Sequence, residues 1–178
     1  MKDDPHGYDI SRLGAQVAVI AVVAVYGITN GFITPLLSLR LEEAGVSTDL
    51  IGLTVAVSAA GTLVVSPFVP RLMAAIGVTR IIALSLVMDA LLVLTLPMFP
   101  GVWSWMAIRF VMGASVACLY IASEMWINEL AQNRTRARVV GAYNAVLSVS
   151  FGIGPLVIVV TGTHGWAPFL VAFAIILC

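Results

Sequence analysis

The chain has 178 residues, of which 61% are hydrophobic and only 10% are charged, and its nine basic and nine acidic residues give no net charge. An ordinary soluble domain carries about 25% charged residues, so this composition argues against a soluble enzyme, a disordered segment and a nucleic-acid-binding protein, which would need a basic patch. What remains is an integral membrane protein in contact with the lipid bilayer. Cys118 and Cys178 both lie in apolar runs, and the sequence indicates no metal site, no cofactor and no enzymatic motif.

Charge-free stretches of membrane-spanning length recur along the chain. A transmembrane helix needs about 20 mainly apolar residues, because the hydrocarbon core of the bilayer is about 30 Å thick. Prolines and glycines at 97–101 and 162–168 divide the longer stretches. The sequence therefore predicts an all-α integral membrane protein in which a cytoplasmic tail, 1–13, precedes a transmembrane domain, 14–178. Its predicted spans are about 14–39, 50–70, 79–98, 102–126, 139–161 and 167–178, and the last is short enough to suggest a truncated helix in a fragment of a longer protein.

The positions of Lys and Arg predict the orientation of these spans. With the N-terminus in the cytoplasm, the outer side carries only Arg40, and Arg109 lies within a span. This bias follows the positive-inside rule and indicates a multi-pass protein of the cell membrane. The predicted cytoplasmic side carries the other seven basic residues, which are Lys2, Arg12, Arg71, Arg80, Arg134, Arg136 and Arg138.

Two spans contain ionisable residues whose burial in lipid would be costly. Asp89 lies near the middle of span 79–98, and we expect it to be protonated or to pair with a donor such as Arg109. At about 100° per residue, Arg109, Gly113, Tyr120 and Glu124 fall on one face of span 102–126. Arg109 then either faces a water-filled cavity or anchors the helix at the outer interface, and Glu124 lies near the cytoplasmic end.

Several motifs resemble the major facilitator superfamily. Segment 70–80 has the length of its signature loop G-x-x-x-D-R-x-G-x-x-R, with Gly77 and Arg80 in place and other positions altered. Arg109 and Gly113 resemble its R-x-x-x-G motif. Further matches are Gly141, Gly154 and Pro155, at the spacing of its antiporter signature, and the turn 165–169, which resembles the start of its sixth helix. The stretch 109–113, Glu124 and the Arg-rich turn look most like the YcaD-like branch.

The resemblance implies a fold and a site. The chain would be the N-terminal six-helix half of a twelve-helix transporter, with a C-terminal half as its partner and the substrate site between the halves. The first, second, fourth and fifth spans would face the cavity. Polar residues at steps of four fit this arrangement on spans 14–39, 50–70 and 139–161. On span 50–70 the row includes Thr54 and Ser66. The predicted cavity-lining residues are Tyr26, Asn30, Thr34, Ser58, Thr62, Arg109, Gly113, Tyr120, Asn144 and Ser148.

The leading functional hypothesis is secondary active transport of a small solute by alternating access, coupled to protons through Glu124 or Asp89. Gly77, Arg80, Gly141, Gly154 and Pro155 would serve the conformational change. One alternative is efflux of drugs or metabolites by antiport. Another is a membrane protein that does not transport, either as a truncated remnant or because it needs a partner half.

Overall fold

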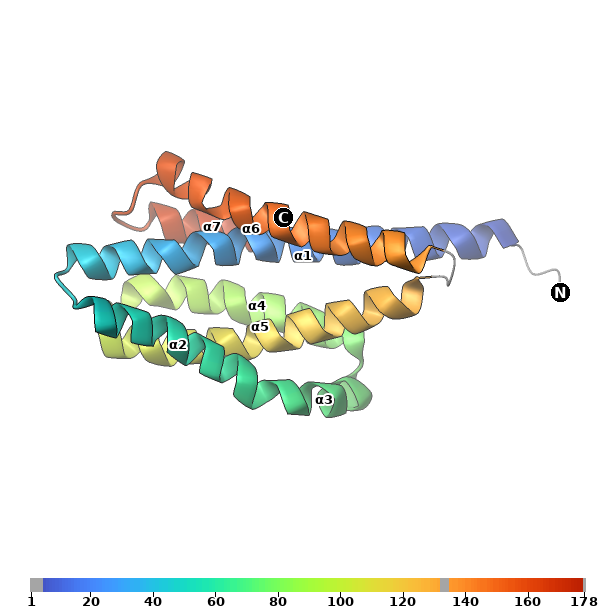
Figure 1. Ribbon diagram of the computed structural model, residues 1–178, viewed down its shortest axis with the longest axis horizontal. Coiled ribbons are helices and arrows are strands. Elements are labelled where there is room, and N and C mark those ends of the chain that lie inside the picture. Colours follow the sequence, from blue (N-terminus) through green and yellow to red (C-terminus); the bar gives the residue numbers. More distant parts are fainter. Residues whose placement is uncertain (1–4, 132–134, 178) are drawn as a thin grey trace.

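The chain folds into helices that run back and forth along one axis (Figure 1). The structure is a computed structural model that describes residues 5–131 and 135–177, with side chains described from residue 13 onward. These residues contain no β-strand, which confirms the predicted all-α bundle. The elements are α1 (Pro5–Glu43), α2 (Thr48–Val65), the 3₁₀ helix η1 (Ser66–Phe68), α3 (Val69–Ile76), α4 (Val78–Met98), α5 (Val102–Leu130), α6 (Arg136–Thr161) and α7 (Ala167–Leu177).

Five helical segments are long and apolar enough to cross a membrane. They are Leu13–Glu43, Thr48–Ile76, Val78–Met98, Val102–Leu130 and Arg136–Thr161, and the sixth apolar helix, α7, has 11 residues. Helix α1 already begins at Pro5, so the part of the predicted tail from residue 5 onward is helical.

The second span differs from the prediction in its shape. Segment 70–76 was expected to be part of a turn, but it is helical, and only Gly77 lies between α3 and α4. The interruption comes earlier, at η1, where Pro67 has no backbone N–H and one regular α-helical hydrogen bond is lost. Gly77 ends α3 with a φ of +87°. Glycine adopts this left-handed conformation readily, whereas it is costly for a residue with a Cβ atom.

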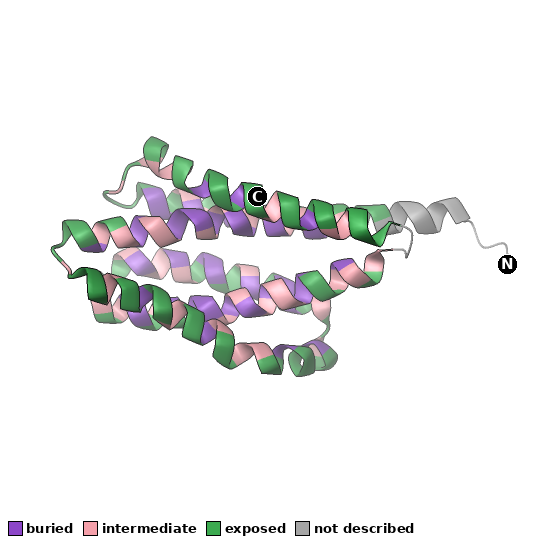
Figure 2. Cartoon of the chain, viewed as in Figure 1, coloured by how far each residue is buried: buried purple, intermediate pink, exposed green. Residues whose placement is uncertain are grey.

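The helices are arranged as two close pairs with a supporting layer. Helix α1 packs along α6, and α2 packs along α5, while α4 contacts both α5 and α7 (Figure 1). The start of α1, the α3–α4 junction and the start of α6 lie at one end of the bundle. Most residues on α2 and α6 remain exposed, whereas α1, α4 and α5 carry most of the buried positions (Figure 2).

Small residues bring each helix pair into backbone contact. A Cβ atom added to Gly154 on α6 would lie 2.4 Å from the carbonyl carbon of Gly31 on α1. A Cβ atom on Gly61 of α2 would lie 2.1 Å from the carbonyl oxygen of Phe110 on α5. Such distances leave no room for a side chain, and small residues are the usual means of close helix approach in membranes. Gly27 and Gly31 of α1 also lie against α6, since an added Cβ atom would lie 2.9 Å from Ser150 Cβ and 2.3 Å from the Phe151 carbonyl oxygen, respectively.

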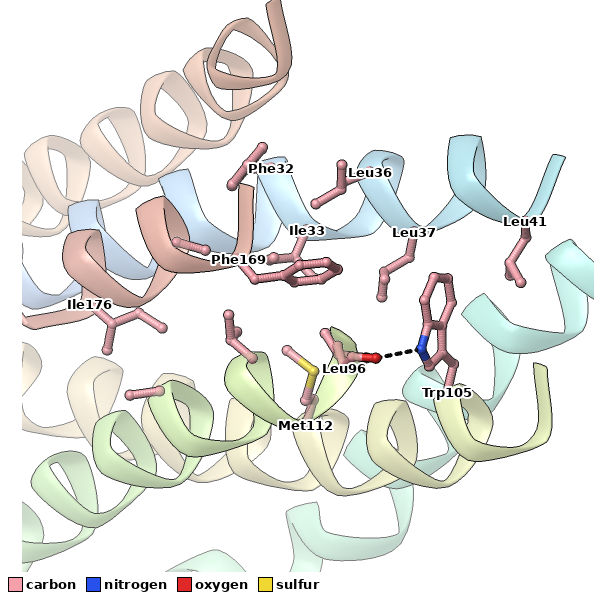
Figure 3. Close-up of a cluster of buried hydrophobic side chains, with 13 residues drawn as sticks. Phe32, Ile33, Leu36, Leu37, Leu41, Leu96, Trp105, Met112, Phe169 and Ile176 are labelled. Carbon is pink, nitrogen blue, oxygen red and sulfur yellow. Dashed lines mark hydrogen bonds between the residues drawn. The ribbon is translucent and has the colours of Figure 1, made fainter. Parts of the chain in front are cut away.

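A cluster of large apolar side chains holds α1, α4, α5 and α7 together (Figure 3). Phe169 of α7 is fully buried between these helices, and the Trp105 indole donates a hydrogen bond of 2.9 Å to the Leu96 carbonyl oxygen. Arg40 ties this end of α1 to the α6–α7 turn, because it donates to the carbonyl oxygens of Thr163 and Gly165 and its guanidinium lies 4.6 Å from the Phe169 ring centroid.

We predict that Gly154→Ala lowers the thermal stability of the purified protein in detergent, because the new methyl group must push α6 away from α1. Overpacking of this kind costs about 1–3 kcal/mol. Gly152→Ala, two residues away on the same helix, is the matched control, because an added Cβ atom there meets nothing within 4 Å. Equal melting temperatures for the two variants would contradict the contact.

Candidate functional site

A polar cavity of about 300 Å³ lies between α1, α2 and α5. Its apolar walls include Met112, Val116 and Phe151, the last contributed by α6. Other lining residues carry hydroxyl, amide or guanidinium groups, and a charged guanidinium in particular is rare in membrane-spanning helices unless it has a function. Five of the predicted cavity-lining residues meet here, namely Asn30, Thr34, Ser58, Thr62 and Arg109.

Arg109 joins the two helix pairs at this cavity. Its side chain starts on α5 and is only 4% exposed. One terminal nitrogen, Nη1, donates a 2.8 Å hydrogen bond to the Thr54 hydroxyl on α2, and Nη2 donates a 3.0 Å bond to the Thr34 carbonyl oxygen on α1. A buried position at the junction of three helices is inconsistent with an arginine that only anchors its helix at the membrane surface.

The positive charge of Arg109 is not balanced by a nearby acid in the described part of the chain. No described carboxylate lies within 4.0 Å of its guanidinium, and the ion pair that the structure shows joins His164 and Glu43 at 3.7 Å. The expected pairing of Arg109 with Asp89 does not occur. Asp89 does turn inward, where it is 5% exposed, but Arg109 points instead toward α1 and α2.

A row of polar side chains leads along α1 away from Arg109. The Thr34 hydroxyl donates to Asn30 Oδ1 at 3.5 Å, and the Asn30 amide donates to the Tyr26 hydroxyl. The Tyr26 ring packs edge-on against Tyr120 of α5, with ring centroids 5.1 Å apart. Residues at steps of four share one helix face, so the predicted stripe on α1 forms a connected row.

The structure does not bring the other predicted residues to the cavity. Gly113 faces α2, where an added Cβ atom would lie 1.9 Å from the Ser58 carbonyl oxygen, and Glu124 is exposed. The face from Arg109 to Glu124 extends over about 22 Å at 1.5 Å per residue, so its members meet different neighbours. Asn144 and Ser148 are exposed on α6 and donate hydrogen bonds to carbonyl oxygens of their own helix.

The residues assigned to conformational motifs also have different surroundings. Gly154 touches α1, whereas Gly141 lies on an exposed face with nothing within 4 Å of an added Cβ atom. Pro155 is exposed inside α6. Gly77 ends α3, and Arg80 is exposed in the first turn of α4 without an ion pair among the described residues.

Thr54 is a site residue that sequence reasoning did not select. It belongs to the same row of residues at steps of four as Ser58 and Thr62, so the signal was present, but nothing in the sequence shows that Arg109 would reach it. No group of three His, Cys, Asp or Glu side chains among the described residues could hold a metal ion.

We predict that Thr54→Val destabilises the protein, because it leaves a buried guanidinium donor without its acceptor. Such a loss costs about 1–3 kcal/mol. Thr95→Val is the matched control, since each threonine donates to a carbonyl oxygen three residues earlier, at 2.8 and 2.7 Å, but only Thr54 also accepts from an arginine. Thermal unfolding in detergent measures both variants, and an equal effect would show that the Arg109 contact contributes nothing.

Comparison with known proteins agrees with this architecture. Residues 19–178 match the Major Facilitator Superfamily. The chain is also 23% identical over 157 residues to an uncharacterized MFS-type transporter of Bacillus subtilis, YfkF, and the match covers 86% of this chain and 39% of that relative's length. The YcaD-like branch remains a prediction. Because the match covers nearly the whole chain, this membrane protein belongs to the major facilitator superfamily of transporters.

Proposed function

We propose that this chain is the N-terminal half of a secondary active transporter that moves a small solute by alternating access. The observation that carries the proposal is the polar cavity around Arg109, enclosed by helices that are otherwise apolar. In such transporters the substrate site lies near the middle of the membrane, between two similar halves. The exposed faces of α2 and α6 offer surface for a second half.

The charge of the cavity supports an anionic substrate. A guanidinium in a membrane interior is costly unless a counter-charge approaches it, and no described side chain of this chain supplies one within 4.0 Å. A guanidinium also presents a planar set of donors that fits carboxylate or phosphate groups. The substrate would provide the missing negative charge when it enters the cavity.

Proton coupling is the second part of the proposal, and Glu124 and Asp89 are its candidate residues. Efflux by antiport remains the alternative direction of transport, supported by the close contact of Gly154 with α1 in the Gly154-Pro155 motif.

We place the protein in the cell membrane with its N-terminus in the cytoplasm. The start of α1 lies at the same end of the bundle as the starts of α4 and α6, which carry Arg80, Arg136 and Arg138. The positive-inside rule assigns this end to the cytoplasm. In intact cells, a cysteine at position 136 should react with a membrane-impermeant thiol reagent only after permeabilisation, whereas one at position 43 should react directly. The reverse pattern would contradict the orientation.

The transport proposal is tested with the complete transporter reconstituted in lipid vesicles. We expect uptake of at least one small carboxylate or phosphate ester, and a change in rate when a proton gradient is imposed. Matched neutral compounds, in which an amide or hydroxyl replaces the anionic group, serve as controls. Transport of neutral solutes only would refute the anionic substrate, and the absence of transport across a broad solute panel would refute the function. The 178-residue chain alone should not transport, because a site shared by two halves needs both.

Variants of Arg109 separate a substrate role from a structural one. Arg109→Lys keeps the charge but loses the planar donor set, so its transport rate should fall between those of wild type and Arg109→Ala. Rates are divided by the amount of folded protein. Wild-type activity of Arg109→Ala after this correction would remove Arg109 from the substrate site.

A further inference from the structure

Asp89 is the unusual group in the interior of the bundle. It lies on α4 and is 5% exposed, and neither of its carboxylate oxygens has a hydrogen-bond partner. Among the described residues, these two oxygens are the buried side-chain polar atoms left without a partner. Buried polar atoms are nearly always hydrogen-bonded, and an isolated buried carboxylate is so costly that such a group normally takes up a proton. The neutral carboxylic acid therefore fits this position better than the ion.

A cavity of about 10 Å³ adjoins Asp89, which is close to the space that one water molecule needs. Three of its walls come from α1, in the form of Tyr26, Thr29 and Asn30. The opposite walls are apolar and include Met112 and Ile176, which are both visible in Figure 3. A water molecule in this position would find the several polar partners that a buried water requires.

The hydrogen bonds of α1 leave a donor free at this cavity. The Thr29 hydroxyl donates to the Val25 carbonyl oxygen, so its proton is already used. Tyr26, in contrast, accepts from the Asn30 amide, so the proton of its own hydroxyl is not engaged in that bond. The Tyr26 hydroxyl can therefore donate toward the carboxyl group of Asp89 through one water molecule.

Few charged or titratable groups surround Asp89. The titratable groups near it are Tyr26 on α1, which lines the same small cavity, and Cys118 on α5. Arg109 is also buried on α5, but its donors bind Thr34 and Thr54. Helix α7 contributes the apolar Ile176, and the buried residues of α3 are the apolar Val69 and Met73. No fixed positive charge therefore holds Asp89 in its ionised form within the described part of the chain.

We propose that Asp89 is a buried proton-binding site, connected by one water molecule to the Tyr26 hydroxyl and by the α1 row to the cavity of Arg109. This proposal rests on the transport function and assigns the coupling proton to Asp89 instead of Glu124, although Asp89 lies on the third span, which is not among those expected to face the cavity. Asn30 and Met112 line both cavities, so they form the partition between the two sites. Glu124 is exposed and lines neither cavity.

The proton step needs no other reactant. When the O–H bond of the Asp89 carboxyl group breaks, the electron pair stays on Asp89 as a carboxylate, and the proton passes through the bridging water to solvent, so the bridging water is left neutral. The Tyr26 hydroxyl then donates through the water to this carboxylate. The new negative charge attracts the guanidinium of Arg109 across Asn30, which weakens the hold of Arg109 on a bound anion. Loss of the proton would thus favour release of the substrate.

Infrared spectroscopy of the reconstituted protein tests the proton directly and needs no substrate. At neutral pH we expect the carbonyl stretch of a protonated carboxylic acid in wild type, its loss in Asp89→Asn and a shift of its frequency in Tyr26→Phe, which removes the hydroxyl donor. If Asp89→Asn does not fold, the frequency shift in Tyr26→Phe still decides the question. A wild-type protein without this band, or a band unaffected by both variants, overturns the proposal whether or not transport has been found.

Transport by the complete protein tests the coupling. Asp89→Asn should still exchange substrate across vesicles at equal pH but should lose the response of the rate to a proton gradient. Glu129→Gln, an exposed acid on α5, is the matched control and should keep this response. A full response in Asp89→Asn, or its loss in Glu124→Gln instead, overturns the assignment to Asp89 but leaves the transport function intact. Loss of equilibrium exchange together with the gradient response would also overturn it, because Asp89 would then act in substrate binding or folding.

Discussion

The geometry of this protein depends on backbone contact between helices at small residues. Gly31 meets Gly154 between α1 and α6, and Gly61 meets Phe110 between α2 and α5. These contacts fix two helix pairs. Their backbones can come this close because glycine has no side chain at the point of contact. The space between the pairs is then available for polar groups. Arg109 crosses this space and binds α1 of one pair and α2 of the other, so its side chain connects the two pairs beside the cavity.

Arg109 and Asp89, both buried in the described part of the bundle, do not form an ion pair with each other. Membrane proteins usually pair such groups, because a lone charge in a medium of low dielectric constant is costly. Here Arg109 binds a hydroxyl and a carbonyl oxygen, while Asp89 lies beside a separate small cavity behind Asn30. In the mechanism that we propose, this separation leaves Arg109 available to an anion and Asp89 available to a proton. A direct ion pair would have removed both properties.

Contacts between α1 and the α6–α7 turn hold together the end of the bundle that carries Arg40 and Glu43. Arg40 binds two carbonyl oxygens of the α6–α7 turn and lies over Phe169, and Glu43 accepts a 3.0 Å hydrogen bond from the Thr163 hydroxyl. These contacts connect the ends of α1 and α7 to the apolar cluster of Figure 3.

The sequence by itself determined the membrane class, the helical fold, the superfamily and the polar row of α1, because these follow from hydrophobicity, spacing and local motifs. It left open whether Arg109 faces a cavity or only anchors its helix at the membrane surface. It could not determine that Arg109 reaches Thr54, that Gly113 faces α2 or that Asp89 stays apart from Arg109. Those outcomes depend on how far each helix is rotated and where it crosses its neighbours, and only packing between residues distant in sequence fixes these quantities. The break at Pro67 illustrates this difference between sequence and tertiary structure. The proline can be read from the sequence, but the helical path of α3 beyond it depends on the burial of Val69 and Met73 against α4 and α5.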